Sequence, residues 1–128
     1  MAREEKKILL FGFETLPEIL RLRDVASTFW AELLPIGRSD YGKTLAVLAG
    51  LEEEGESAEP GMIPGRMAVL CGLDGELDGL LPAMQRAGAG ESCLKAVLTR
   101  HNRNWSAPHL YEELSREREA IRRGQNRT

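Results

Sequence analysis

Two patterns of apolar residues alternate along this chain. Short, nearly continuous apolar runs predict buried strands over residues 6–13 (KKILLFGF), 31–36 (AELLPI), 66–73 (RMAVLCGL) and 92–99 (SCLKAVLT). Between and after these runs, apolar residues recur at helical spacing and predict helices over residues 15–30, 44–51, 77–87 and 107–123. The wholly apolar LAVLA segment within 44–51 also permits a strand there.

Start signals accompany two of these predicted helices. Thr15 and Glu18 have the spacing of a capping box. Ser106 is a good N-cap residue, and Trp105 and Leu110 have the spacing of a hydrophobic staple around it. We therefore expect the tryptophan to clamp the start of the last helix, with a base-stacking platform as the alternative.

The order strand–helix–strand–helix occurs twice. The first and third strands lie 60 residues apart, with Gly12 matching Gly72 and Glu14 matching Asp74. This self-similarity indicates a diverged internal duplication. Glu14 and Asp74 would then lie at the ends of equivalent strands, and the alternatives for the two carboxylates are that they face each other or that they complement helix dipoles.

The predicted halves span residues 1–51 and 66–128, joined by an acidic Gly/Pro linker over residues 52–65. Neither half has enough strands for a stable sheet, so we expect one four-stranded sheet shared by both. Alternating strands and helices predict an α/β fold with right-handed crossovers and a largely parallel sheet. The alternative is an α+β, ferredoxin-like arrangement.

Composition predicts a cytoplasmic protein without membrane contact. The 128-residue chain is 42% hydrophobic and 29% charged, and its longest apolar runs are far shorter than the roughly 20 residues that span a bilayer. Cys71 and Cys93 fall in apolar runs and are expected to be buried and reduced. Two cysteines and two histidines are too few for a convincing zinc site, so we expect no metal.

Charge is unevenly distributed along the chain. The net charge is −3, which makes general nucleic-acid binding unlikely. Residues 1–94 nevertheless carry 9 basic and 16 acidic side chains, whereas residues 95–128 carry 8 and 4. A nucleic-acid contact by the basic last helix is therefore a weak third hypothesis, with these candidate residues: Arg116, Arg118, Arg122, Arg123 and Arg127.

The segment GRSDYGKT, residues 37–44, matches the spacing of a phosphate-binding P-loop. Such a loop would bind a magnesium nucleotide through its glycine-rich backbone, a lysine and a hydroxyl, which here are Gly37, Gly42, Lys43 and Thr44. Asp40 would place a carboxylate inside the cradle, and Tyr41 is bulky for such a loop. The favoured interpretation is a turn that caps the following short helix, and no cofactor is then expected.

The segment TRHNRNWS, residues 99–106, is the most polar junction in the chain. It follows a predicted strand, and ligands of open α/β folds collect beyond the carboxyl ends of strands. Its polar side chains are suited to bind an anion or a carboxylate. The candidate ligand-binding residues are Thr99, Arg100, His101, Asn102, Arg103 and Asn104, with solvated surface charge as the alternative.

The sequence has no arrangement of nucleophile, base and carboxylate with a spacing typical of catalysis. We therefore predict a binding or interaction module, rather than an enzyme, that acts through its strand-end loops. Its expected partner is another protein or a small anionic ligand, and a homodimer is possible.

The segment CLKAVLTRHNRNWSAPHLYEELSRE resembles the C-terminal signature of a small bacterial family, domain of unknown function 3783. In that family a strand leads through N-x-x-W into an acidic helix, and these residues match: Leu94, Lys95, Ala96, Val97, Leu98, Thr99, Asn102 and Trp105. The resemblance covers about residues 66–122. It implies no activity, substrate or cofactor.

Overall fold

The computed structural model describes residues 5–53, 55, 57 and 59–125. Its helices and strands are β1 (Lys7–Phe11), α1 (Leu16–Thr28), β2 (Glu32–Pro35), η1 (Arg38–Asp40), α2 (Leu45–Leu48), β3 (Arg66–Cys71), η2 (Asp74–Glu76), α3 (Leu77–Arg86), β4 (Cys93–Val97) and α4 (Ala107–Gln125). The strands form one four-stranded sheet. The predicted α/β class is thus confirmed, and the segment after Thr44 is a helix rather than a strand.

The sheet is mixed, with the strand order β2-β1-β3-β4. The outer pairs β1–β2 and β3–β4 are parallel, but the central pair β1–β3 is antiparallel. The prediction of a largely parallel sheet is therefore wrong at the centre, and the strand order differs from the ferredoxin-like alternative. The cause is segment 52–65, which begins beside the start of β1 and enters β3 beside the end of β1.

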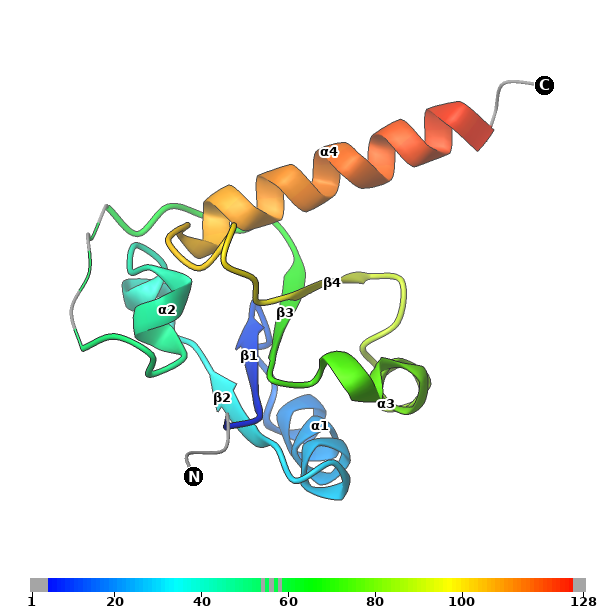
Figure 1. Cartoon of the computed structure of the whole chain (residues 1–128). Helices are drawn as coiled ribbons and strands as arrows, with labels where there is room; N and C mark the ends of the chain where they lie inside the picture. Colours follow the sequence, from blue (N-terminus) through cyan, green and yellow to red (C-terminus); the bar gives the residue numbers. More distant parts are fainter. Residues whose placement is uncertain (1–4, 54, 56, 58, 126–128) are drawn as a thin grey trace.

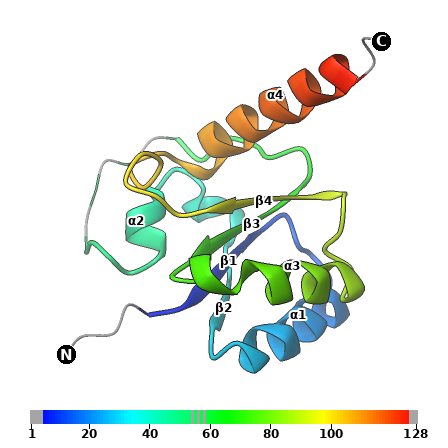
Figure 2. The same ribbon diagram turned by 45° about the vertical axis from the view of Figure 1, so that its right-hand side comes forward.

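Helices cover both faces of the sheet (Figures 1 and 2). Alternate strand residues point to opposite faces: Ile8 and Leu10 pack with α1 and α3, whereas Leu9 and Phe11 pack with α2 and the first turns of α4. Each face therefore has its own hydrophobic core. The C-terminal part of α4 extends beyond the sheet (Figure 1).

The two β-α-β units are related by an approximate two-fold axis. Leu9 pairs with Val69, 60 residues further on, at the centre of the antiparallel ladder. Equivalent bonds follow both outer strands: the Ile36 amide donates to the Leu10 carbonyl at 2.8 Å, and the Leu98 amide to the Leu70 carbonyl at 2.9 Å. This symmetry is a property of the fold. An origin by internal duplication, and the division into 1–51, 52–65 and 66–128, stay predictions.

Two local expectations are wrong. Thr15 is the N-cap residue of α1, but its side chain makes no capping bond, and the Glu18 carboxylate is paired with Arg66 of β3 at 3.4 Å. Glu14 and Asp74 do not face each other. They follow the carboxyl ends of β1 and β3, and these ends lie at opposite edges of the sheet because the two strands are antiparallel.

Candidate functional site

The two loops singled out in the sequence occupy equivalent positions in the fold. Residues 37–44 lead from β2 into α2, and residues 99–106 lead from β4 into α4. The loops meet on the two-fold axis, where Thr44 and Ser106 form an isolated antiparallel bridge. The Leu45 amide also donates to the Trp105 carbonyl at 2.9 Å. The structure thus brings the ends of both candidate loops together.

The backbone amides in and after GRSDYGKT are used by the protein itself. Within the loop, the amides of Asp40, Tyr41 and Lys43 each donate to the carbonyl three residues earlier. At the start of α2, the Leu45 and Ala46 amides donate to carbonyls of the other loop, and the Val47 amide donates to the Thr44 hydroxyl at 3.3 Å. A phosphate cradle needs such amides to point at the ligand.

The side chains of this loop are also engaged. Lys43 Nζ lies 2.9 Å from Asp40 Oδ1, so the lysine is paired with the carboxylate of its own loop. Gly37 lies at the entry of the 3-10 turn η1 in an extended conformation, and Gly42 is buried. Thr44 caps α2, which has only four residues. This geometry is that of a helix-capping turn.

Tyr41 has a role that the sequence analysis missed. Its side chain is buried, and its ring packs edge-on against Phe11 at 5.6 Å between centroids. The Gly12 amide donates to its hydroxyl oxygen at 2.9 Å. The tyrosine therefore fastens the loop after β2 to the end of β1. The only sequence signal was a bulky aromatic residue in a polar loop.

The second loop is held by a buried asparagine. Asn102 is 7% exposed. Its Oδ1 accepts from the Thr99 amide at 2.9 Å, and its Nδ2 donates to the Val97 carbonyl at 3.1 Å. Arg103 is paired with Glu52 at 3.0 Å. Thr99, Asn102 and Arg103 of the predicted ligand loop are therefore engaged in holding the loop itself.

The remaining members of that loop, Arg100, His101 and Asn104, are exposed. His101 packs edge-on against Trp105, with centroids 5.0 Å apart, and the His109 ring stacks on Trp105 with centroids 4.3 Å apart. Trp105 also packs against the core on the α4 side. Its contacts thus fit the predicted clamp.

A pocket of about 350 Å³ lies where β1 and β2 end and β3 begins. It is lined by Gly12, Glu14, Arg38 and Tyr41 from the loops after β1 and β2, and by residues 61–66. Gly12 has a φ of +80°, and a Cβ there would collide with the Gly65 carbonyl. We call this the strand-end pocket. Arg38 belongs to GRSDYGKT and forms an ion pair with Glu14 at its rim.

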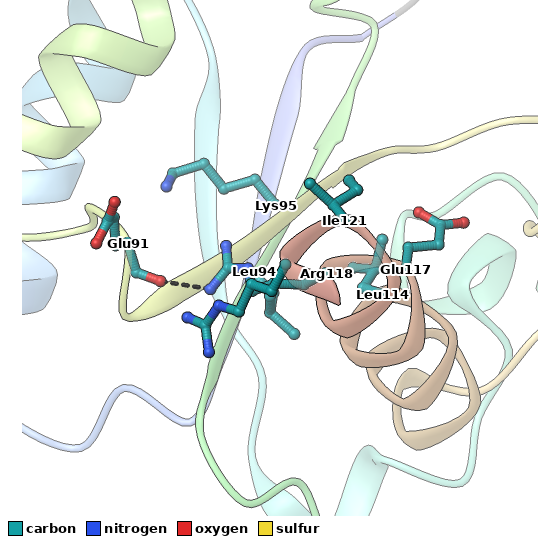
Figure 3. Close-up of a pocket in the computed structure, with 8 residues that line it drawn as sticks. Glu91, Leu94, Lys95, Leu114, Glu117, Arg118 and Ile121 are labelled. Atoms are coloured by element: carbon teal, nitrogen blue, oxygen red, sulfur yellow. Dashed lines mark hydrogen bonds between the residues drawn. The ribbon is translucent and has the colours of Figure 1, made fainter. Parts of the chain in front are cut away.

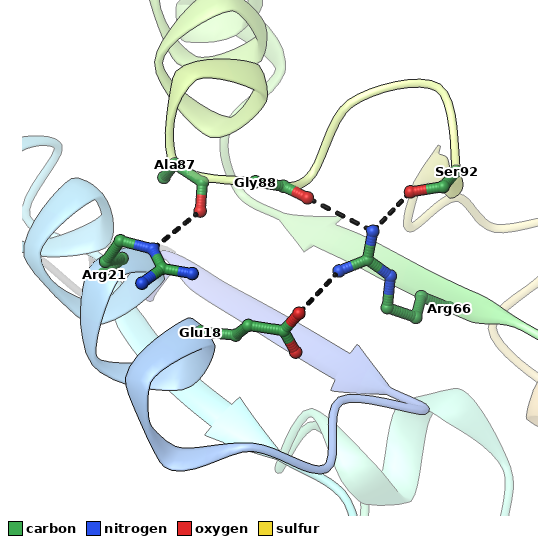
Figure 4. A network of polar contacts seen from close by, with 6 residues as sticks. All are labelled: Glu18, Arg21, Arg66, Ala87, Gly88 and Ser92. Carbon is green, nitrogen blue, oxygen red and sulfur yellow. Dashed lines mark hydrogen bonds and ion pairs between the residues drawn. The ribbon is translucent and has the colours of Figure 1, made fainter.

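Arg66 fixes one wall of the strand-end pocket (Figure 4). Its guanidinium pairs with Glu18 at 3.4 Å, donates to the Gly88 carbonyl at 3.2 Å and contacts the Ser92 hydroxyl. It also lies 5.0 Å from the centroid of the Phe13 ring. Because these contacts join α1, β3 and the loop before β4, they hold the Arg66 side chain in place at the pocket wall.

The described residues limit two other kinds of chemistry. Among them, no three His, Cys, Asp or Glu side chains gather closely enough to hold a metal ion. None of their helices combines the length and the apolar character needed to cross a membrane. Cys71 and Cys93 are both buried, as expected.

Comparison with known proteins identifies one family. Residues 66–121 match the family described as domain of unknown function (DUF3783). The resemblance inferred from the sequence is thus confirmed for the segment that runs from β3 into α4. No curated protein and no solved structure matches the chain. The strand-end pocket has residues from both halves, and only Arg66 lies in the matched segment.

Proposed function

We propose that this chain is a cytoplasmic, non-catalytic binding module whose ligand enters the strand-end pocket. The observation that carries the proposal is the position of Tyr41. Its buried hydroxyl lies beside Gly12 and accepts a hydrogen bond there, and no described residue accepts its proton. Open α/β sheets bind ligands beyond the carboxyl ends of their strands, and β1 and β2 both end at this pocket.

The charges at the rim indicate the kind of ligand. Arg38 and Glu14 are paired but mostly exposed, with 78% and 66% of their side chains accessible. Such an exposed pair contributes little stability, about 0–1 kcal/mol, so a ligand can replace either partner at small cost. A small polar molecule with an anionic group would bind Arg38 in place of Glu14 and accept a hydrogen bond from Tyr41. A pocket of about 350 Å³ is suited to such a molecule.

The other two hypotheses have less support. Nucleotide binding through GRSDYGKT requires free amides and a free lysine, whereas the amides of Asp40, Tyr41 and Lys43 are engaged and Lys43 is paired with Asp40. Nucleic-acid binding by α4 requires a basic stripe. Of its arginines, Arg116 and Arg123 are paired with glutamates on the same helix, and Arg127 lies outside the described residues.

The two-fold symmetry supplies a matched pair of variants. Arg38 and Arg100 occupy equivalent positions in the two loops, and both are exposed. Amide NMR spectra would be recorded during titrations with L-glutamate, inorganic phosphate and Mg·ATP, using wild type, Arg38→Ala and Arg100→Ala. We expect at least one of these probes to move the Gly12 and Gly65 signals saturably. The shift should be lost in Arg38→Ala and kept in Arg100→Ala.

Three outcomes would contradict the proposal. If binding is lost in Arg100→Ala and kept in Arg38→Ala, the ligand site is the loop 99–104 instead. If only Mg·ATP binds, and Lys43→Ala abolishes this binding, GRSDYGKT is a phosphate loop. Absence of any saturable shift would show that this pocket does not take small anions.

A further inference from the structure

A second pocket, of about 360 Å³, lies between the edge strand β4 and the C-terminal part of α4 (Figure 3). Lys95 of β4 and Arg118 and Arg122 of α4 supply its positive charge, and Leu114 and Ile121 supply apolar surface. We call it the edge pocket. None of its lining residues lines the strand-end pocket, so it is independent of the proposed function.

The three cations of the edge pocket have no carboxylate partner among the described residues. Lys95 donates to the carbonyls of Gly90 at 2.9 Å and Cys93 at 3.2 Å. Arg118 donates through Nη1 to the Glu91 carbonyl at 2.6 Å. Arg122 makes no ion pair or hydrogen bond with a described residue. Lys95 and Arg118 therefore retain donors that point to no protein acceptor.

Other arginines on the same helix are neutralised. Arg116 lies 2.6 Å from Glu112, and Arg123 lies 3.4 Å from Glu119. The edge pocket is also lined by Glu91 and Glu117, but their carboxylates lie at its outer sides, away from the Arg118 guanidinium (Figure 3). The cations without partners are thus concentrated where the pocket lies.

The charges around Lys95 also favour a bound anion. Burial lowers the pKa of its ammonium, the Cys93 thiol opposes this effect, and the charges of Arg118 and Arg66 lower the pKa further. A cation held near two other cations gains from a bound anion, because the anion offsets their mutual repulsion. The apolar stem of such a ligand would lie on Leu114 and Ile121.

We propose that the edge pocket binds a small molecule carrying two or more anionic oxygens, held by Lys95, Arg118 and Arg122. Phosphate and carboxylate groups share this chemistry. Pyrophosphate and citrate are suitable probes, because each presents several oxygens within one small molecule and together they distinguish the two sources.

The test uses adjacent arginines as matched variants. Arg122 and Arg123 both lie in the last turns of α4, where a cation complements the helix dipole equally, but only Arg122 lines the pocket. Thermal unfolding would be followed during titration with sodium pyrophosphate or citrate at constant ionic strength. We expect a saturable rise of the unfolding temperature, with affinity about tenfold weaker in Arg122→Gln and Arg118→Gln. The affinity for the probe should change less than about twofold in Arg123→Gln and Arg116→Gln.

Arg118→Gln also loses the bond to the Glu91 carbonyl and would be somewhat less stable. Arg122→Gln loses no contact within the described chain, so it remains a valid test on its own. A saturable shift with only one probe supports the proposal and names the anion class. No saturable shift with either probe overturns it. Equal weakening in all four variants also overturns it, because the effect would then be one of general charge, as in nucleic-acid binding.

Discussion

The loops 37–44 and 99–106 make the same backbone connection with different side chains. Both have eight residues, both lead from an outer strand into a helix, and both meet on the two-fold axis. In the first loop Asp40 is partly exposed and paired with Lys43, whereas its counterpart Asn102 is buried and bonded to the backbone twice. The first loop is instead fastened by Tyr41, which reaches the end of β1.

A polar residue in such a loop can therefore have one of two roles: it can hold the loop in place, or it can help to form the wall of a pocket. Asn102 satisfies backbone groups of its own loop and of the end of β4, the strand directly before it. Tyr41 satisfies a backbone group of another strand end, and the surface between the two segments becomes the strand-end pocket. A loop can thus resemble a ligand-binding motif in sequence while its polar groups are occupied by the fold.

The largest expected difference comes from removing the side chain of the buried asparagine. Asn102→Ala leaves the Thr99 amide and the Val97 carbonyl without partners, and buried unpaired groups cost about 1–3 kcal/mol each. We expect a loss of about 2–3 kcal/mol in the free energy of unfolding, measured by urea denaturation. Asp40→Ala is the matched control and should cost less than about 0.5 kcal/mol, because its ion pair is exposed. Similar losses in both variants would contradict the comparison.

The two helix caps provide a smaller contrast. Thr44 is 7% exposed and accepts from the Val47 amide at 3.3 Å. Ser106 accepts from the His109 amide at 3.5 Å. We expect Thr44→Ala to cost about 1 kcal/mol and Ser106→Ala about 0.5 kcal/mol by urea denaturation, as for moderate and weak N-caps. A larger loss in Ser106→Ala would mean that the second loop depends on its cap rather than on Asn102.

The lysine of the P-loop-like segment should matter least for stability. Lys43→Ala removes one exposed ion pair, so its urea midpoint should correspond to a loss below about 0.5 kcal/mol. Its thermal shift with Mg·ATP should equal that of wild type. If Mg·ATP stabilises the wild type but not Lys43→Ala, GRSDYGKT is a phosphate loop, and its interpretation as a helix-capping turn is wrong.

The strands before the two loops are β2 and β4, and only β4 contains a buried thiol, that of Cys93. We expect this difference to affect stability only at high pH. Burial raises the pKa of the Cys93 thiol above its ordinary value of 9.0, against the opposing charges of Lys95, Arg66 and Arg118. The unfolded chain therefore loses this proton first. The thiol's contribution to stability is complete below pH 9.0 and is lost as the pH rises toward the raised value. Urea denaturation between pH 8 and 10.5 should show a smaller alkaline loss for Cys93→Ala than for wild type. The same slope in both would exclude Cys93 as the cause.

Local patterns in the sequence predicted the elements of this fold well. The apolar runs locate all four strands, and the helical stripes locate α1, α3 and α4 within a few residues of their observed ends. The capping box at Thr15 does not form, and its Glu18 carboxylate instead contacts Arg66, 48 residues further along the chain. For the same reason, the strand-end pocket was not predicted. Its residues come from three separated segments, and only the paired positions of β1, β2 and β3 bring them together.

The sequence by itself determined the order of strands and helices, the burial of the strands and the similarity of the two halves, because these depend on periodicity within short windows. The tertiary structure alone decided the antiparallel centre of the sheet, since the aperiodic segment 52–65 carries no signal for the direction in which β3 enters. It also decided that the amides of Leu45 and Ala46, directly after GRSDYGKT, donate to the second loop. Such contacts depend on which distant groups meet, and local patterns hold no information about those partners.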